Sequence, residues 1–326
     1  MTLKSLLLSS LMLLSAGTAW ADVEINETNF PDEKFRSYLL SQEYGWDEKL
    51  TDSEIAGLRM MSVCSKGIQS LQGIEYFTAL LMLDCYDNQL TSLDVSKNTA
   101  LIKLDCYDNQ LTSLDVSGCT ALTELYCYDN QLTSLDVSKN TALKTLSCYN
   151  NQLTSLDVSK NTALEYLFCY WNQLTSLDVS KNTALTYLYC SDNQLTSLDV
   201  SNTALTNLYC YSNKIQGAAM DALVESLPTV VSGDGMQVVY YEKEQNVMTT
   251  TQVAAAKAKG WIPYYTENGL IWKEYAGVDP STGVNNIEAT DADDSAPWYT
   301  IKGDKLAEKP TAPGIYIHGG KKVLVK

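Results

Sequence analysis

The sequence is poor in histidine and in basic residues. It contains a single histidine, and 23 lysine and arginine residues stand against 39 aspartate and glutamate residues, so the formal net charge is −16. A strongly acidic chain repels the phosphates of nucleic acids and of anionic lipids. We therefore expect no nucleic-acid partner, and a cationic or neutral ligand fits this composition better.

The residue patterns of most catalytic and metal sites are also missing. The one histidine, His318, precedes two glycines and is expected in a surface turn, and neither a zinc-ligand spacing nor a phosphate-binding loop occurs. The aspartates recur in every repeat, whereas a catalytic pair should interrupt the repeat at one place. Residues 43–54 resemble a calcium-binding loop but lack its first Asp and central Gly, which favours a helical cap with an acidic loop. We expect no enzyme activity, no cofactor and no bound metal.

Long apolar runs are absent except near the N-terminus. Lys4 precedes the apolar stretch from Leu6 to Leu14, which is too short to span a bilayer. The sequence Ala19-Trp20-Ala21 has the small-x-small form of a signal-peptidase site. This pattern predicts a signal peptide over residues 1–21, with a buried N-terminal helix as the alternative. The protein is then exported, without a transmembrane segment, to the cell surface or the extracellular medium.

The middle of the chain consists of a repeat of 21 residues, L-x-x-L-x-C-x-x-N-x-L-T-S-L-D-V-S-K-N-T-A, with one copy shortened by a residue. Fixed internal periods of this length indicate a solenoid whose stacked coils share one core. Alternation in L-x-x-L-x-C turns Leu104 and Cys106 inward and Lys103, Asp105 and Tyr107 outward. Asn109 should bond to the backbone of neighbouring coils. Strands are predicted at 80–85, 101–106, 122–127, 143–148, 164–169, 185–190 and 205–210.

Seven of the nine cysteines occupy the same inward position of successive coils. Their Cβ vectors should be parallel, which disfavours disulfides between adjacent coils. Cys64 lies one place outside this series, and Cys119 replaces an asparagine of the other coils. We expect reduced, buried thiols that pack as small apolar groups. The seven are Cys85, Cys106, Cys127, Cys148, Cys169, Cys190 and Cys210.

The units "LIKLDCYDNQL" and "LTELYCYDNQL" resemble bacterial leucine-rich repeats. The first unit, "IQSLQGIEYF", is similar to internalin repeats, and "LTSLDVSKNTAL" is similar to surface proteins of the Bacteroidetes. The resemblance implies an α/β repeat fold: a right-handed leucine-rich repeat solenoid with a parallel, concave β-sheet that carries the ligand. It does not identify that ligand.

Composition shifts divide the chain further. A helical N-terminal cap and an α/β C-terminal cap should enclose the repeats, and a polar linker should lead to a small β tail. Gly314, Tyr316 and the Gly320–Val323 segment of the tail resemble the C-terminal sorting domains of type IX secretion cargo. A β appendage that only packs on the cap is the alternative. The predicted segments are 1–21, 22–57, 58–216, 217–276, 277–296 and 297–326.

Outward strand positions differ between coils although the framework is nearly invariant. Early coils carry acidic residues there and later coils carry aromatic ones, which predicts a ligand site. The acidic candidates are Asp84, Asp87, Asp105, Asp108 and Asp129. The aromatic candidates are Tyr149, Tyr166, Phe168, Tyr170, Trp171, Tyr187, Tyr189, Tyr209 and Tyr211. A tyrosine ladder that only stabilises the sheet is the alternative.

These patterns predict a recognition or adhesion protein. Its partner would be a host or bacterial surface protein, or a glycan, bound by a monomer on the concave face. The competing function is a structural spacer of the cell envelope, in which the repeats only hold a shape.

Overall fold

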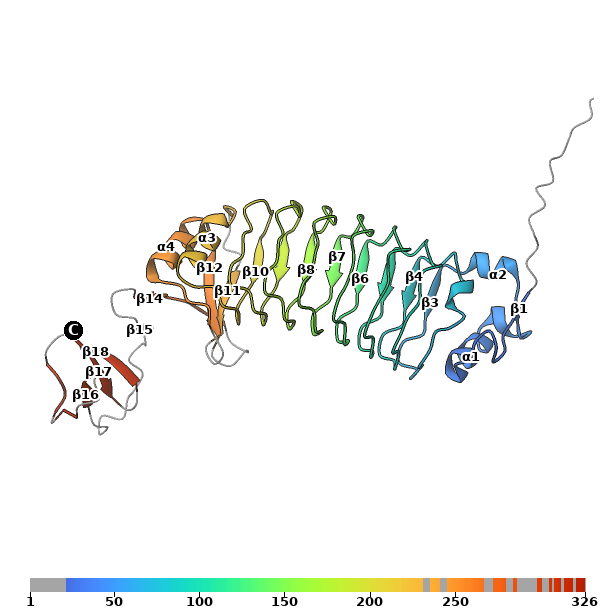
Figure 1. Cartoon of the computed structure of the whole chain (residues 1–326), viewed down its shortest axis with the longest axis horizontal. Helices are drawn as coiled ribbons and strands as arrows, with labels where there is room; N and C mark the ends of the chain where they lie inside the picture. The colour runs from blue at the N-terminus through green and yellow to red at the C-terminus, as the bar shows by residue number, and fades with distance from the viewer. Residues whose placement is uncertain are drawn as a thin grey trace, which may run out of the picture.

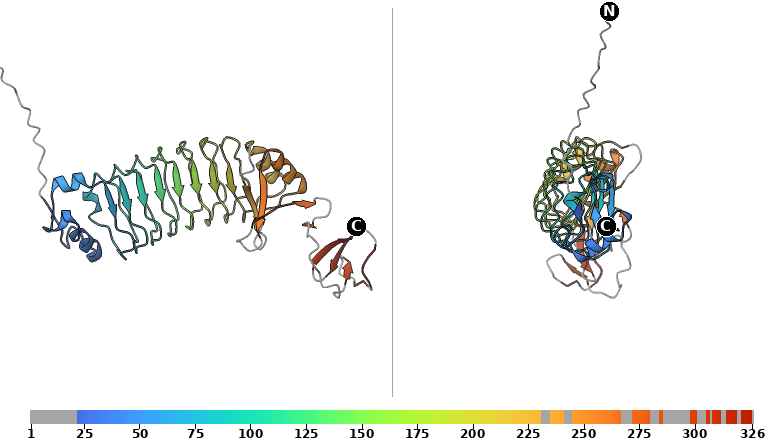
Figure 2. Two further views of the ribbon diagram at one scale, coloured as in Figure 1. Left: turned by 180° about the vertical axis from the view of Figure 1, so that it is seen from behind. Right: turned by 90° about the vertical axis from the view of Figure 1, so that its right-hand side faces the viewer.

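The computed structural model describes residues 22–230, 235–240, 245–266, 272–279, 284–285, 298–300, 305–306, 308–311, 314–318 and 321–325. The predicted signal peptide and most of the predicted linker lie outside these residues. The repeats form a rod of stacked coils with a cap at each end (Figure 1). Seen along its length, the rod shows its coils overlying one another (Figure 2). None of the described helices is long and apolar enough to cross a membrane.

One sheet of eleven strands runs the length of the rod, in the order β13-β12-β11-β10-β9-β8-β7-β6-β5-β4-β3. Equivalent residues of successive coils pair in parallel, as Leu125 does with Leu104 and Leu146. This register confirms the predicted solenoid, and no described residue between β4 and β10 is helical. The repeat strands are β3 (Met60–Ser62), β4 (Met82–Asp84), β5 (Lys103–Asp105), β6 (Glu124–Tyr126), β7 (Thr145–Ser147), β8 (Tyr166–Phe168), β9 (Tyr187–Tyr189) and β10 (Asn207–Tyr209).

Each strand has three residues, half the predicted length. Leu101, placed in a strand by the sequence, instead closes a turn by donating its N–H to the Asn98 carbonyl. After Cys106 the chain soon enters the left-handed region at Asp108, with φ of 52°. Turns at both ends therefore shorten the strand, although the leucine and cysteine side chains point inward as predicted.

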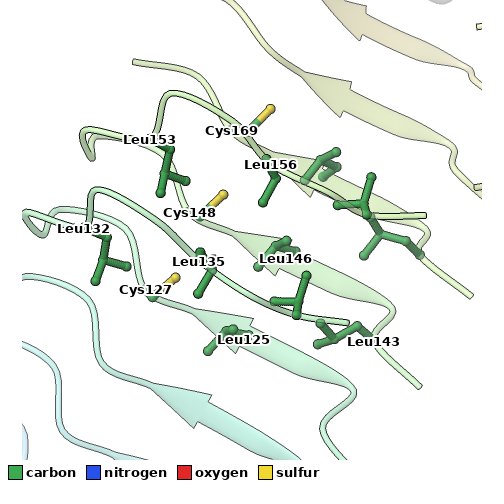
Figure 3. Close-up of a cluster of buried hydrophobic side chains, with 14 of the residues drawn as sticks. Leu125, Cys127, Leu132, Leu135, Leu143, Leu146, Cys148, Leu153, Leu156 and Cys169 are labelled. Carbon is green, nitrogen blue, oxygen red and sulfur yellow. The ribbon is translucent and has the colours of Figure 1, made fainter. Parts of the chain in front are cut away.

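Leucine and cysteine side chains fill the inside of the coils (Figure 3). Buried valines such as Val137 complete this core. The seven predicted ladder cysteines are all fully buried thiols that form no disulfides. Val63 takes the inward place in the first coil, so Cys64 lies outside the ladder as predicted. Burial removes solvent from the thiols and raises the pKa of Cys148 to about 12. Thiols held protonated in this way behave as apolar groups.

Asparagine side chains join each coil to the one before it. Asn130 accepts the N–H of Leu111 and donates to the carbonyl of Cys106, both in the preceding coil. A second asparagine column on the return donates to buried carbonyls, as Asn140 does to Val116. Cys119 replaces one member, and its thiol donates to the Val95 carbonyl over 3.4 Å. Backbone groups that a short strand leaves unpaired are thus satisfied by amides.

The recurring aspartates of the return are structural, as predicted. Each accepts the backbone N–H of the serine two residues on, as Asp136 does from Ser138 at 2.8 Å. These bonds favour the ionised carboxylate and lower the pKa of Asp136 from its ordinary value. The same bond occurs at Asp94, Asp115, Asp157, Asp178 and Asp199.

The N-terminal cap contains β1 (Val23–Glu24), α1 (Glu33–Leu40), η1 (Glu43–Gly45), β2 (Lys49–Leu50) and α2 (Asp52–Gly57), and η2 (Ile74–Tyr76) follows in the first coil. The predicted capping box of Thr51 and Glu54 opens α2. Asp32 caps α1 with one carboxylate oxygen and accepts the N–H groups of Gln69 and Ser70 with the other. This one side chain therefore ties the cap to the first coil.

The C-terminal cap extends the sheet, as predicted. Helices α3 (Ala218–Ser226) and α4 (Thr250–Ala258) alternate with the parallel strands β11 (Gly235–Tyr240) and β12 (Ile262–Thr266), and the antiparallel β13 (Trp272–Glu274) ends the sheet. A hairpin of β14 (Val278–Asp279) and β15 (Val284–Asn285) follows. The tail forms its own sheet of β16 (Trp298–Thr300), β17 (Gly314–His318) and β18 (Lys321–Val325). His318, predicted in a turn, belongs to β17, where it pairs with Lys321.

Candidate functional site

The outward side of β4–β10, here called the sheet face, carries all the predicted site residues or borders them. Parallel register lines up the first strand residues in one column, the third in a second, and the residue after each ladder cysteine in a third. The next residue lies in a left-handed turn in every coil. Predicted site residues therefore fall into four parallel columns.

The third column is a stack of tyrosines, here called the tyrosine column. Tyr86, Tyr107, Tyr128, Tyr149 and Tyr170 lie ring on ring, with centroids 4.2–4.5 Å apart and planes within 12° of parallel. Cys64 stands at the head of the column, and its hydrogen bond with Tyr86 raises the pKa of that phenol to about 12. Stacking of this kind stabilises adjacent strands, as the alternative interpretation of the tyrosines expects.

The aromatic patch lies on β8–β10 and comprises Tyr166, Phe168, Tyr187, Tyr189 and Tyr209. Tyr166 and Tyr187 stack at 5.0 Å, Phe168 meets Tyr189 edge-on at 5.0 Å, and Tyr189 stacks on Tyr209 at 4.0 Å. The rings are half-buried. Burial together with the hydroxyl of Tyr209 raises the pKa of Tyr189, so this phenol stays neutral.

Trp171 borders the aromatic patch in the left-handed turn of its coil. Its φ is 51°, and equivalent turns are formed by Asp, Asn or Ser. The indole is 53% exposed and meets the Tyr170 ring edge-on at 5.4 Å. Positive φ is strained for a bulky residue, and strain of this kind concentrates at functional sites. Trp171 is therefore the most unusual residue of the sheet face.

The acidic patch lies on β4–β6 and consists of Asp84, Asp105 and Glu124. Lys103 lies among them, 3.1 Å from Asp105 Oδ2 and 5.4 Å from the centre of the Tyr126 ring. Asp105 is only 8% exposed, and burial outweighs the lysine so that the pKa of its carboxyl rises. One carboxylate oxygen of Asp84 and one of Asp105 are buried without a hydrogen-bond partner.

Asp87, Asp108 and Asp129 do not join this patch. They occupy the left-handed turns beside the tyrosine column, with φ between 51° and 54°. Asp129 accepts a hydrogen bond from the side-chain amide of Asn150 in the next coil. Their carboxylates border the sheet face, and their residue type suits the turn conformation. The alternation of the strand therefore does not extend to these three aspartates, because a turn follows the strand.

Three contributors were not predicted. Alternation alone could have placed Lys103 and Tyr126 beside the acidic residues, since both lie at outward positions. Trp272 of β13 packs against Tyr211 with ring centres 5.4 Å apart, and nothing in the repeat predicts a contact with a residue 61 positions later. Among the described residues, no group of three or more His, Cys, Asp or Glu side chains could hold a metal ion.

Comparison with known proteins agrees with this geometry. Residues 99–140 match the family described as "Leucine Rich repeats (2 copies)". The chain is 28% identical to the functional domain of InlJ from Listeria monocytogenes, which includes a cysteine ladder; the alignment covers 83% of this chain with a TM-score of 0.57. It spans only 64% of that InlJ chain.

Internalin C2 of the same organism aligns over 75% of this chain and 97% of its own, at 21% identity and a TM-score of 0.56, which supports the fold alone. A search of curated proteins gave no match. The chain therefore has a leucine-rich repeat solenoid fold and is similar in structure to internalin-like bacterial proteins.

Proposed function

We propose that this chain is a non-catalytic recognition or adhesion protein, exported to the cell surface or medium, that binds its ligand on the sheet face. Trp171 carries the proposal, since it places an exposed indole in a strained turn that the equivalent coils fill with Asp, Asn or Ser. Tyr170 and Tyr189 complete the centre of the site. The leucine-rich repeat fold supports a protein-interaction or recognition role.

The test is a binding panel of glycans, host matrix proteins and bacterial surface proteins, probed with the exported chain. Replacing both Trp171 and Tyr189 by alanine should weaken binding about tenfold or more, because large aromatic side chains dominate interface energetics. The matched control is Gln152→Ala with Lys160→Ala, two exposed residues of the return. Unchanged binding by the double aromatic variant would exclude the site.

The tyrosine column favours a second function, that of a structural spacer in the cell envelope. Five self-stacked rings stiffen the sheet without any ligand. For a spacer, the double aromatic substitution would lower the melting temperature, and no member of the panel would bind in a way that depends on the sheet face. The two functions thus predict opposite results from one pair of variants.

A further inference from the structure

The way in which the aromatic rings pack limits the ligands that they can contact. Within the tyrosine column, and between Tyr189 and Tyr209, ring faces are covered by neighbouring rings 4.0–4.5 Å away. A sugar that stacks on aromatic side chains needs free ring faces. Edges and hydroxyl groups remain for a ligand, together with the exposed indole of Trp171. Such mixed apolar and hydrogen-bonding surfaces are typical of tyrosine-rich sites that bind proteins.

The acidic patch adds a second requirement. Asp84 and Asp105 are directly paired across β4 and β5, so two carboxylates of like charge are adjacent. Their buried, unpartnered oxygens lack the donors that buried carboxylates normally have. The patch holds three carboxylates and one ammonium group, which leaves a charge of −2 that a cationic side chain would offset.

Building on the proposed function, we propose that the partner is a protein bound lengthwise on the sheet face in one fixed direction. An arginine or lysine of the partner would donate to Asp84 and would take the place of Lys103 on Asp105. An apolar or aromatic side chain of the partner would pack on Trp171. The two contact points lie three to four coils apart, roughly 14–19 Å at the usual spacing of adjacent strands.

The experiment selects partners without assuming their identity. A phage-displayed library of random 20-residue peptides is enriched on the full exported chain, and a glycan array is probed in parallel. Enriched peptides should carry a basic residue and an aromatic or aliphatic residue that can span this distance. Dissociation constants are then measured for wild type, for Asp84→Asn with Asp105→Asn, and for Trp171→Asn.

Each variant should weaken peptide binding by about tenfold or more, and only the effect of the aspartate variant should shrink at high salt. Asp136→Asn with Asp157→Asn is the control: it removes two charges from the return and keeps an acceptor oxygen for each serine N–H. This control should bind as wild type does. Thermal melts of all variants establish that each is folded.

Three outcomes would overturn the inference. If the enriched peptides bind the aspartate variant as tightly as wild type, the partner makes no contact with the acidic patch. Glycan binding that depends on Trp171, without peptide binding, would make the partner a carbohydrate and leave the proposed function standing. If neither the peptides nor the glycans bind in a way that depends on the sheet face, this inference and the proposed function are both wrong.

Discussion

A tryptophan in a left-handed turn reduces stability, and this cost can be measured. Trp171→Asn should raise the free energy of unfolding by about 1 kcal/mol, because Asn adopts positive φ more readily than a bulky residue. Urea denaturation would give this value. The reverse change, Asp108→Trp at an equivalent turn, should lower stability by a similar amount. If Trp171→Asn destabilised the protein, the indole would be a packing residue and not one held for a ligand.

Asp32 couples the N-terminal cap to the repeats through a single carboxylate. Burial alone would raise its pKa, but hydrogen bonds from Phe35, Gln69, Ser70 and Lys34 outweigh it, and the pKa is lowered from 3.8. An acid whose folded pKa is depressed contributes stability that is present above its unfolded pKa and is lost as the pH falls through the folded value. The link between cap and first coil should therefore weaken in acid.

We predict that Asp32→Ala lowers the free energy of unfolding by roughly 1–3 kcal/mol at pH 7, the range for a lost helix cap and unpaired N–H groups. Below about pH 4, near the ordinary pKa of aspartate, the difference from wild type should shrink. Urea titrations at several pH values would check this. Glu33→Gln, next to it on α1, is the control and should show no such pH-dependent loss. A constant difference at all pH values would mean that the charge is irrelevant.

The cysteine ladder is a packing element, and its variants should behave accordingly. Cys148→Val should cost little, because a buried valine, Val63, takes the equivalent inward place in the first coil. Cys148→Asp should cost several kcal/mol, because it buries a charge that has no partner. Thermal or urea denaturation distinguishes the two. In the native protein, the seven ladder thiols should resist a thiol reagent until the chain unfolds. A disulfide peptide linking Cys106 and Cys127, isolated under non-scrambling conditions, would contradict this packing.

The repeat elements could be predicted from sequence because every coil solves the same packing problem. The leucine and cysteine positions predicted which side of the strand faces inward. The asparagine at the turn of each coil, such as Asn130, predicted the bonds to the backbone of neighbouring coils. Strand length was overestimated, since the alternating pattern continues into residues such as Leu101 that lie in turns. The contact of Trp272 with Tyr211 joins a strand of the C-terminal cap to the last repeat coil. A repeat pattern carries no information about such contacts.

The tail bears on where the whole molecule functions. Its predicted motif lies on β17 and β18, except for Gly320, which is outside the described residues. We predict that deletion of residues 297–326 leaves the protein in the periplasm, as expected if the tail is a sorting signal. Cell fractionation and surface labelling would measure this, with Lys305→Ala as a control that preserves the tail strands. Normal surface display after the deletion would show that the tail has no part in sorting.

Because equivalent residues of neighbouring coils pair without offset, the rod can be lengthened or shortened only in whole coils. A duplication or loss of the β7 coil, between β6 and β8, would leave the acidic and aromatic patches intact and change the distance between them by one step of about 4.8 Å. The near-identical sequences of these coils make such exchanges easy during recombination. The number of coils thus sets the separation of the two contact points, and selection can change this separation without altering the residues of either point.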